Sequence, residues 1–266
     1  MSVEGGYPAS ELWPTLNILD GGGFGGYDLP DSDALGGRAF TLNLGGETLE
    51  LTFAGDSRLA WRVAEGERRD EEGREACTVK ENGRELFLVN WVSAADENVA
   101  MTVVLDLRDD LTTVVRSRVV EDGGRRRVEE RIDHGAIGGA PAGATHAPST
   151  DLVGRRVLYV YGRDNAYEHI YLNEHAYTWH CLAGAERGLA DTDACTAIRI
   201  AEDVYLFCWR EKVVPCDGVV LINFAEHRST GRIFGYDDEA RATNAIAMGA
   251  RSVVLNETRH DPGLWA

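Results

Sequence analysis

The sequence has few basic residues and no long apolar run, and each shortage excludes a class of protein. Lys and Arg number 27 against 44 Asp and Glu, so the formal charge is −17. Such a charge repels the phosphates of nucleic acids and anionic membrane surfaces. No run of about 18 apolar residues could span a membrane, and residues 1–12 lack the basic and apolar regions of a secretion signal. We therefore expect no nucleic acid and no membrane among its partners.

Motifs for common catalytic and metal sites are also missing. The five cysteines form no C-x-x-C pair and no regular framework, which favours reduced thiols and a cytoplasmic location. His169, His175 and His180 are six and five residues apart, which matches no common metal site. The glycine cluster at 21–26 lacks the Lys-Ser/Thr pair of a phosphate-binding loop, so we expect a flexible loop or lid there. The sequence predicts neither a metal nor a cofactor.

What the chain does contain is an internal repeat of its tryptophans. Trp61 and Trp179 are 118 residues apart, and so are Trp91 and Trp209, among only six tryptophans. Further pairs keep nearly the same offset: Gly37-Arg38 with Gly154-Arg155, Cys77-Thr78 with Cys195-Thr196, and Val103-Val104-Leu105 with Val219-Val220-Leu221. This agreement indicates two copies of one unit of roughly 115 residues.

A segment rich in Gly, Ala and Pro, residues 135–150, separates the two copies as a linker would. We place the boundary near Thr150. The first predicted domain is then 1–150, with a glycine-rich leader, and the second is 151–266. The basic run at 125–127 is flanked by acids, which predicts a solvated strand face rather than a binding arm.

Apolar and polar residues alternate with a period of two in short runs, which indicates β-strands. About eight strands per copy avoid unpaired edges only if each sheet closes on itself. The predicted fold class is therefore all-β, with two tandem antiparallel barrels, each wide enough for one small ligand. Only Glu239–Met248 indicates a helix.

The two copies differ at positions predicted to face inward. Alternation along Val204–Val213 places Tyr205, Phe207, Trp209 and Glu211 on one face. The same rule groups further polar and aromatic residues in the second copy: Tyr159, Tyr161, His169, Tyr171, Tyr177, Trp179 and Cys181. Matching positions in the first copy hold Leu42, Leu44, Leu51, Leu59 and Ser93. We expect the first barrel to be packed shut and the second to be polar inside.

Buried polar groups cost on the order of 1–3 kcal/mol each when they lack a hydrogen-bond partner, so such a cluster is either a satisfied structural network or a site. We predict a ligand pocket in the second barrel with Glu211 and His169 as acid–base groups. Its predicted walls are Tyr159, Tyr161, Tyr171, Tyr177, Trp179 and Trp209. Arg228 and Arg232 flank a predicted turn at 229–231 and could clamp an anionic ligand, although surface arginines are the simpler interpretation.

Several segments resemble those of a known family. They are Trp209-Arg210-Glu211-Lys212, Pro215, Gly218, Arg228, Gly231 and Phe234-Gly235-Tyr236-Asp237 in the second copy, and Trp13-Pro14-Thr15-Leu16, Gly23-Phe24, Leu35 and Gly37 near the start. They are similar to the molybdenum-cofactor biosynthesis protein F (MoaF) family. The resemblance implies two lipocalin-like (calycin) barrels and a role around molybdenum cofactor production, and it implies no catalytic residue.

Three functions are compatible with these observations. The first is a small-molecule-binding protein that holds a pterin or another planar aromatic ligand in the second barrel. The second is a cofactor-free acid–base enzyme, such as a decarboxylase, isomerase or hydratase of a small aromatic compound, in which Glu211 transfers the proton. The third is a scaffold whose two barrels are packed shut. The sequence does not determine the oligomeric state.

Overall fold

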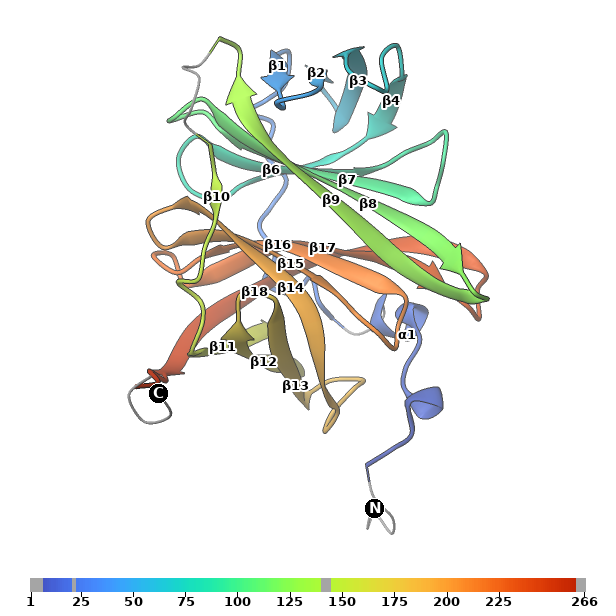
Figure 1. The fold of residues 1–266 in the computed structure, drawn as a ribbon, viewed down its shortest axis with the longest axis vertical. Helices are drawn as coiled ribbons and strands as arrows, with labels where there is room; N and C mark the ends of the chain where they lie inside the picture. Colours follow the sequence, from blue (N-terminus) through green and yellow to red (C-terminus); the bar gives the residue numbers. More distant parts are fainter. Residues whose placement is uncertain (1–6, 21–22, 140–144, 262–266) are drawn as a thin grey trace.

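The computed structural model describes residues 7–20, 23–139 and 145–261, and these are almost entirely β-sheet (Figure 1). A 3-10 turn, η1 (Ser10–Leu12), and one short helix, α1 (Leu16–Asp20), precede the strands. The N-terminal sheet contains β1 (Ala39–Asn43), β2 (Thr48–Ala54), β3 (Arg58–Glu65), β4 (Glu72–Ala76), β5 (Thr78–Glu81), β6 (Leu86–Val92), β7 (Val99–Asp106), β8 (Leu111–Asp122) and β9 (Arg125–Ile137). The C-terminal sheet contains β10 (Ala147–Pro148), β11 (Arg155–Gly162), β12 (Asn165–Asn173), β13 (Ala176–Ala183), β14 (Ala190–Ala201), β15 (Val204–Arg210), β16 (Cys216–Asn223), β17 (Arg228–Asp237) and β18 (Ala242–Glu257).

Each sheet curls into an antiparallel barrel. In the C-terminal sheet, β14 pairs with β13 through its first half and with β15 through its second half, which closes the ring of β11 to β18. In the N-terminal sheet the same role is divided between β4, which pairs with β3, and β5, which pairs with β6. Only Cys77 separates these two strands. The prediction of two tandem barrels is confirmed.

Strand registers repeat between the barrels, as a duplication requires. Leu51 lies opposite Trp61 in the first barrel, and His169 lies opposite Trp179 in the second. Trp91 lies opposite Met101, and Trp209 lies opposite Gly218. Equivalent positions can therefore be compared directly.

Three local predictions are wrong. The helix predicted over Glu239–Met248 is a turn followed by the start of β18, in which Ile246 and Met248 are buried and the intervening Ala247 is exposed. Pairing with β17 along ten positions overrides the helix propensity of the alanines. The turn predicted at 229–231 lies inside β17, and the predicted linker begins too early, because β9 continues to Ile137. Within that linker, residues 140–144 lie outside the described residues.

The two barrels pack through apolar outer faces. Leu86, Leu88, Val104 and Val115 of the first barrel form one buried cluster with residues of the second: Ile198, Ile200, Val204, Leu206, Cys208, Val219 and Leu221. Cys208 alternates with Phe207 and Trp209 and so faces away from the interior of its own barrel, where it contacts the other barrel instead of solvent. Both faces of these strands are consequently buried.

A buried charge network also crosses this interface. The Arg232 guanidinium donates to Asp217 Oδ1 at 2.7 Å within its own barrel. It also donates to Ser117 Oγ at 2.7 Å and to Thr102 Oγ1 at 3.1 Å in the other barrel. Asp217 accepts a further hydrogen bond from Ser117. Arg232 therefore holds the barrels together and does not form a clamp with Arg228.

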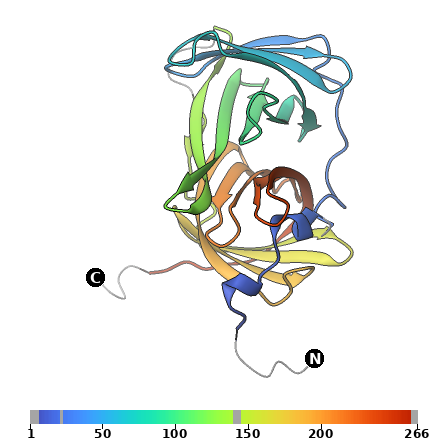
Figure 2. The same cartoon turned by 90° about the vertical axis from the view of Figure 1, so that its right-hand side faces the viewer.

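The N-terminal segment crosses to the barrel that is distant in sequence (Figure 2). Leu16, Leu19 and Phe24 are buried in the hydrophobic core of the C-terminal barrel. The Asn17 amide donates to Asp237 at 2.7 Å, and the Gly249 amide donates to the Phe24 carbonyl at 2.9 Å. Part of the glycine cluster, residues 21–22, lies outside the described residues.

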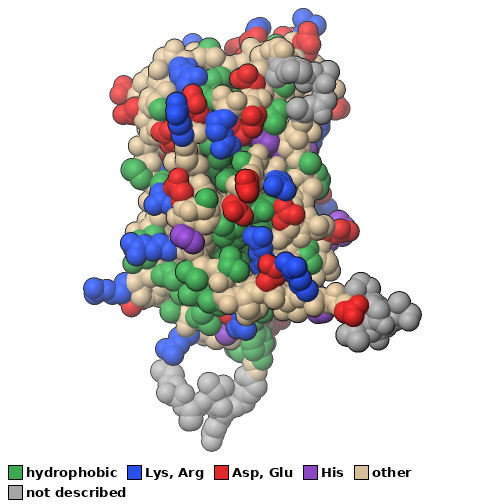
Figure 3. Space-filling view, turned by 90° about the vertical axis from the view of Figure 1, so that its left-hand side faces the viewer, with side chains coloured by type: hydrophobic (Ala, Val, Ile, Leu, Met, Phe, Trp, Pro, Cys, Tyr) green, Lys and Arg blue, Asp and Glu red, His purple; other side chains and the backbone are tan. Residues whose placement is uncertain are grey.

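Surface charge agrees with a chain that carries many acids and scattered bases. On the face in Figure 3, Lys and Arg side chains are interspersed with Asp and Glu over both barrels. The basic run is an exposed face of β9, as predicted, where Arg126 pairs with Asp238 and Arg127 pairs with Asp122 and Glu129. Within the described ranges, no helix has the length and apolar character needed to cross a membrane.

Candidate functional site

Equivalent positions line a cavity in each barrel, but the two cavities differ in size. The N-terminal cavity has a volume of about 260 Å³, and the C-terminal cavity about 30 Å³, which is room for roughly one water molecule. Trp61 and Trp91 line the first, and their equivalents Trp179 and Trp209 line the second.

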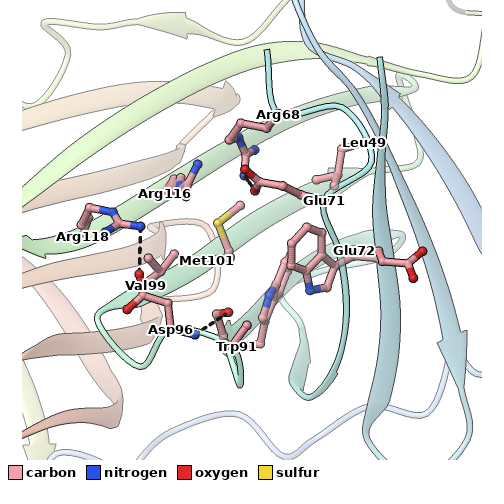
Figure 4. Close-up of a pocket in the computed structure, with 13 residues that line it drawn as sticks. Leu49, Arg68, Glu71, Glu72, Trp91, Asp96, Val99, Met101, Arg116 and Arg118 are labelled. Atoms are coloured by element: carbon pink, nitrogen blue, oxygen red, sulfur yellow. Dashed lines mark hydrogen bonds and ion pairs between the residues drawn. The ribbon is translucent and has the colours of Figure 1, made fainter. Parts of the chain in front are cut away.

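Apolar and cationic side chains face each other across the N-terminal cavity (Figure 4). Trp61, Trp91, Leu49, Val99 and Met101 supply the apolar wall. Arg68, Arg116 and Arg118 extend toward the cavity from the other side, with Met101 between Arg116 and Trp91. The carboxylates of Glu71, Glu72 and Asp96 also line this cavity.

Two hydrogen-bond donors in this cavity have no acceptor within the described part of the chain. The Trp91 indole N–H is buried without a partner, whereas the Trp61 indole N–H donates to Glu75 at 3.2 Å. Arg68 pairs with Glu47 and Glu71, and Arg118 pairs with Asp96. Half-buried Arg116 makes no comparable hydrogen bond or ion pair in the described ranges. Burial, followed by the nearby Arg68 charge, lowers the pKa of Arg116, and the Glu71 and Glu47 charges offset only part of this shift.

The prediction that the first barrel is packed shut is therefore wrong. Leu42, Leu44, Leu51 and Leu59 do fill its interior, where all four are buried. The sequence comparison overlooked the strand that carries Arg116. Met101 lies opposite Arg116 in the first barrel, whereas Gly218 lies opposite Ile233 in the second. The cationic wall thus belongs to the first barrel alone.

The C-terminal interior gathers the aromatic residues that the sequence predicted. His169 lies at their centre, with ring centroids 4.6 Å from Tyr159, 5.0 Å from Tyr177 and 6.1 Å from Trp209. Tyr159 and Tyr171 share a hydrogen bond of 2.8 Å between their hydroxyls. Tyr161, Tyr177, Trp179 and Trp209 line the small cavity together with His169 and Glu211.

Arg228 lies apart from this group. It is partly exposed at the start of β17, 3.9 Å from Glu226, and it does not line the cavity. The ligand-binding role predicted for Arg228 has no geometric support, because the turn expected beside it is at 224–227.

Burial shifts the pKa values of the two predicted acid–base groups, His169 and Glu211, toward their uncharged forms. Burial lowers the pKa of His169 to about 3, so the imidazole is neutral at pH 7. The Glu211 side chain is partly exposed toward the groove between the barrels, but its carboxyl accepts from the Trp209 indole N–H at 3.2 Å. Burial, followed by the Glu186 and Asp193 charges, raises the pKa of Glu211.

Sequence reasoning missed several residues of both sites. Tyr167 and Glu186 share a hydrogen bond of 2.7 Å beside the C-terminal cavity, and Leu19 and Phe24 cover it. In the first barrel it missed Arg116, although Val114, Arg116 and Arg118 alternate along β8 and so share a face. Among the described residues, no group of three or more His, Cys, Asp or Glu could hold a metal ion.

Comparison with known proteins gives the family. Residues 11–121 match the MoaF N-terminal domain, and residues 146–258 match the MoaF C-terminal domain. "Protein MoaF" of Klebsiella aerogenes is 31% identical over 239 residues, which cover 84% of this chain and 87% of that protein. A solved structure from Burkholderia vietnamiensis, named "putative beta-lactamase", matches 39% of this chain and 93% of its own at 11% identity and a TM-score of 0.34. On the strength of both domain matches and the Klebsiella relative, the chain belongs to the MoaF family.

Proposed function

We propose that the protein binds a small, planar, anionic molecule in its N-terminal barrel, in the context of molybdenum cofactor biosynthesis. The observation that carries the proposal is the buried Trp91 indole N–H, which lacks an acceptor in the described ranges and faces a cavity that the half-buried Arg116 guanidinium also lines. Buried donors without acceptors cost on the order of 1–3 kcal/mol each. A ligand that supplies oxygen acceptors would recover that free energy.

The shape and chemistry of the cavity narrow the ligand class. Its volume of about 260 Å³ is just below the usual range for ligand sites, about 300–1,000 Å³, and so favours a small ligand. Two tryptophans favour a flat ring system. Arg68 and Arg118 already pair with carboxylates, so Arg116 is the arginine that favours a carboxylate or phosphate group on the ligand. A pterin that carries one acidic substituent combines these properties, and the family's link to the molybdenum cofactor points to the same class.

Titration with pterin-6-carboxylate tests this proposal. We expect saturable quenching of tryptophan fluorescence in the wild type, because Trp61 and Trp91 line the cavity. Arg116→Met should weaken binding by about 10- to 100-fold, the loss expected for one hydrogen bond to a charged group. Unsubstituted pterin, which lacks the acidic group, should bind the wild type and Arg116→Met with similar affinity.

The matched control is Arg74→Met. Arg74 is exposed on β4 of the same barrel and does not line the cavity, so its variant should bind like the wild type. Equal affinity of pterin-6-carboxylate for the wild type and Arg116→Met would exclude Arg116 as the anion-binding group. An equal loss in both variants would indicate long-range charge rather than a site.

Acid–base catalysis by Glu211 and His169 stays a prediction for the C-terminal barrel. Burial lowers the pKa of His169 to about 3, which makes the imidazole a weak base at pH 7, whereas an efficient general base has a pKa near the working pH. The turnover of small aromatic acids by Glu211→Gln, measured against the wild type, decides whether that carboxyl transfers a proton.

A further inference from the structure

The C-terminal cavity retains polar groups that nothing in the described structure satisfies. His169 Nδ1 and Glu186 Oε1 are buried without hydrogen-bond partners, and both residues line the cavity of about 30 Å³. His169 and Glu186 are each 5% exposed. Two unpaired acceptors or donors at one buried point indicate that a hydrogen-bonding group belongs there.

Two side chains from outside the barrel, Leu19 and Phe24, line this cavity together with the barrel's own residues. Phe24 contacts Tyr161 edge to face, with ring centroids 5.0 Å apart, and its ring lies 5.7 Å from Tyr167. Leu19 lies beside it on the cavity wall. Both come from the N-terminal segment, more than a hundred residues before the strands that they cover. Phe24 therefore places one flat ring in a box of aromatic residues.

Among the described residues, none from the N-terminal segment lines the equivalent cavity of the first barrel, which is larger. Leu49 of the first barrel, which lies opposite Val63, corresponds to Tyr167 of the second, which lies opposite Cys181. Leu49 borders the open cavity, whereas Tyr167 contacts Phe24. The difference in volume between the two cavities thus coincides with the presence of the N-terminal segment in the second.

We propose that the C-terminal barrel is a second small-molecule site, that Phe24 occupies it in this structure, and that its ligand is an uncharged nitrogen heterocycle that replaces the Phe24 ring. Tyrosine and tryptophan rings supply flat contacts, and His169 and Glu186 supply the hydrogen bonds that Phe24 cannot make. The ligand differs in charge from that of the first barrel, because Arg68 and Arg116 are replaced here by Glu186 and Ile233.

The electrostatics of the interior agree with an uncharged ligand. Burial lowers the pKa of His169 to about 3, which leaves one ring nitrogen as an acceptor and one as a donor. Burial also raises the pKa of Glu186. An anion would meet the carboxyls of Glu186, Asp193 and Glu211 without any arginine on the cavity wall.

The Phe24→Ala variant tests the proposal with unsubstituted pterin as the probe, by isothermal titration calorimetry. Removing the ring that the ligand must displace should tighten binding by about 10- to 100-fold, the factor that corresponds to burial of one phenylalanine side chain. The gain should disappear in Phe24→Ala/His169→Phe, which keeps the enlarged cavity but loses the hydrogen bonds. Ile18→Ala is the matched control, because Ile18 is exposed on α1 and should leave binding unchanged.

A folded Phe24→Ala protein that binds pterin no better than the wild type would overturn the proposal. A gain that persists in Phe24→Ala/His169→Phe would also overturn it, because binding would then lie elsewhere. Near-ultraviolet circular dichroism establishes folding, and Phe24→Leu replaces Phe24→Ala under the same criteria if the latter unfolds. Because unsubstituted pterin also fits the first barrel under the proposed function, the titrations are fitted to two sites, and only the site that Phe24→Ala creates and His169→Phe removes is assigned to the second barrel. Failure of the first site is detected separately by Arg116→Met with the anionic probe.

Discussion

Arg232 offers the sharpest test of how the two barrels are held together. It is 3% exposed, pairs with Asp217 in its own barrel, and donates to Ser117 and Thr102 in the other. Arg232→Met removes the cation and leaves the Asp217 carboxylate buried without its counter-charge. Loss of one partner of a buried ion pair costs about 3–5 kcal/mol.

A second buried carboxyl, that of Glu130, increases the loss of stability expected for Arg232→Met. Glu130 lies close enough to Asp217 for the two carboxyls to interact, and burial together with the Asp217 charge raises the pKa of Glu130. Without Arg232, Arg210 would be the remaining cation beside Glu130 and Asp217, and it pairs with Glu130 at 2.8 Å. The Asp217 carboxylate would then have no counter-charge of its own. We expect the melting temperature to fall by roughly 6–20 °C, at 2–4 °C for each kcal/mol.

Differential scanning calorimetry at pH 7 measures this effect, and Arg228→Met is the control. Arg228 is on the same strand but is partly exposed and 3.9 Å from Glu226, so its loss should cost no more than about 0.5 kcal/mol. Arg232→Met/Asp217→Leu should recover much of the stability, because no unpaired charge remains at the Arg232–Asp217 position. If Arg232→Met melts within 2 °C of Arg228→Met, the reasoning about this network fails.

Three further predictions concern the C-terminal barrel and the thiols. Because burial lowers the pKa of His169 to about 3, only the unfolded state binds its proton between that pH and about 6.5. The free energy of unfolding of the wild type should therefore fall relative to that of His169→Phe as the pH falls through this range, by up to about 1.4 kcal/mol per pH unit. Urea unfolding at pH 7, 6 and 5 measures this, and an equal change of unfolding free energy with pH in the two proteins would contradict it. Gly218→Ala would place its Cβ 2.0 Å from Trp209 Cζ2, so it should cost about 1–3 kcal/mol and change the near-ultraviolet circular dichroism; Gly55→Ala, with open space around it, should do neither. All five cysteines are buried, so the native protein should react with Ellman's reagent only after unfolding, and rapid reaction of a native thiol would refute the packing described for it.

The sequence determined the barrels, because the signals for them are local. Alternation along Val204–Arg210 is a property of the extended chain itself, whichever partner the strand has. The tryptophan offset of 118 residues identified the duplication, and it also located equivalent positions correctly. The helix predicted at 239–248 failed where ten positions of pairing with β17 outweighed local propensity.

The sequence predicted the aromatic cluster of the second barrel but not the arginines that line the cavity of the first. The cluster of His169, Tyr159, Tyr171, Tyr177 and Trp209 assembles as alternation predicts. Arg116 could not be assigned to an interior, because β8 carries apolar residues on both faces: Val114 lines the barrel core and Val115 packs in the interface. Alternation distinguishes two faces of a strand but does not say which one is inside when both are buried.

Only the tertiary structure decided which barrel is open. Local sequence placed the polar residues in the second barrel, and a pocket was expected there. Leu19 and Phe24 fill that interior from a segment that precedes the first barrel, and no local pattern specifies where such a segment packs. Short-range alternation determines which segments are strands and which residues share a face, whereas the occupant of a cavity depends on contacts between residues far apart in the chain.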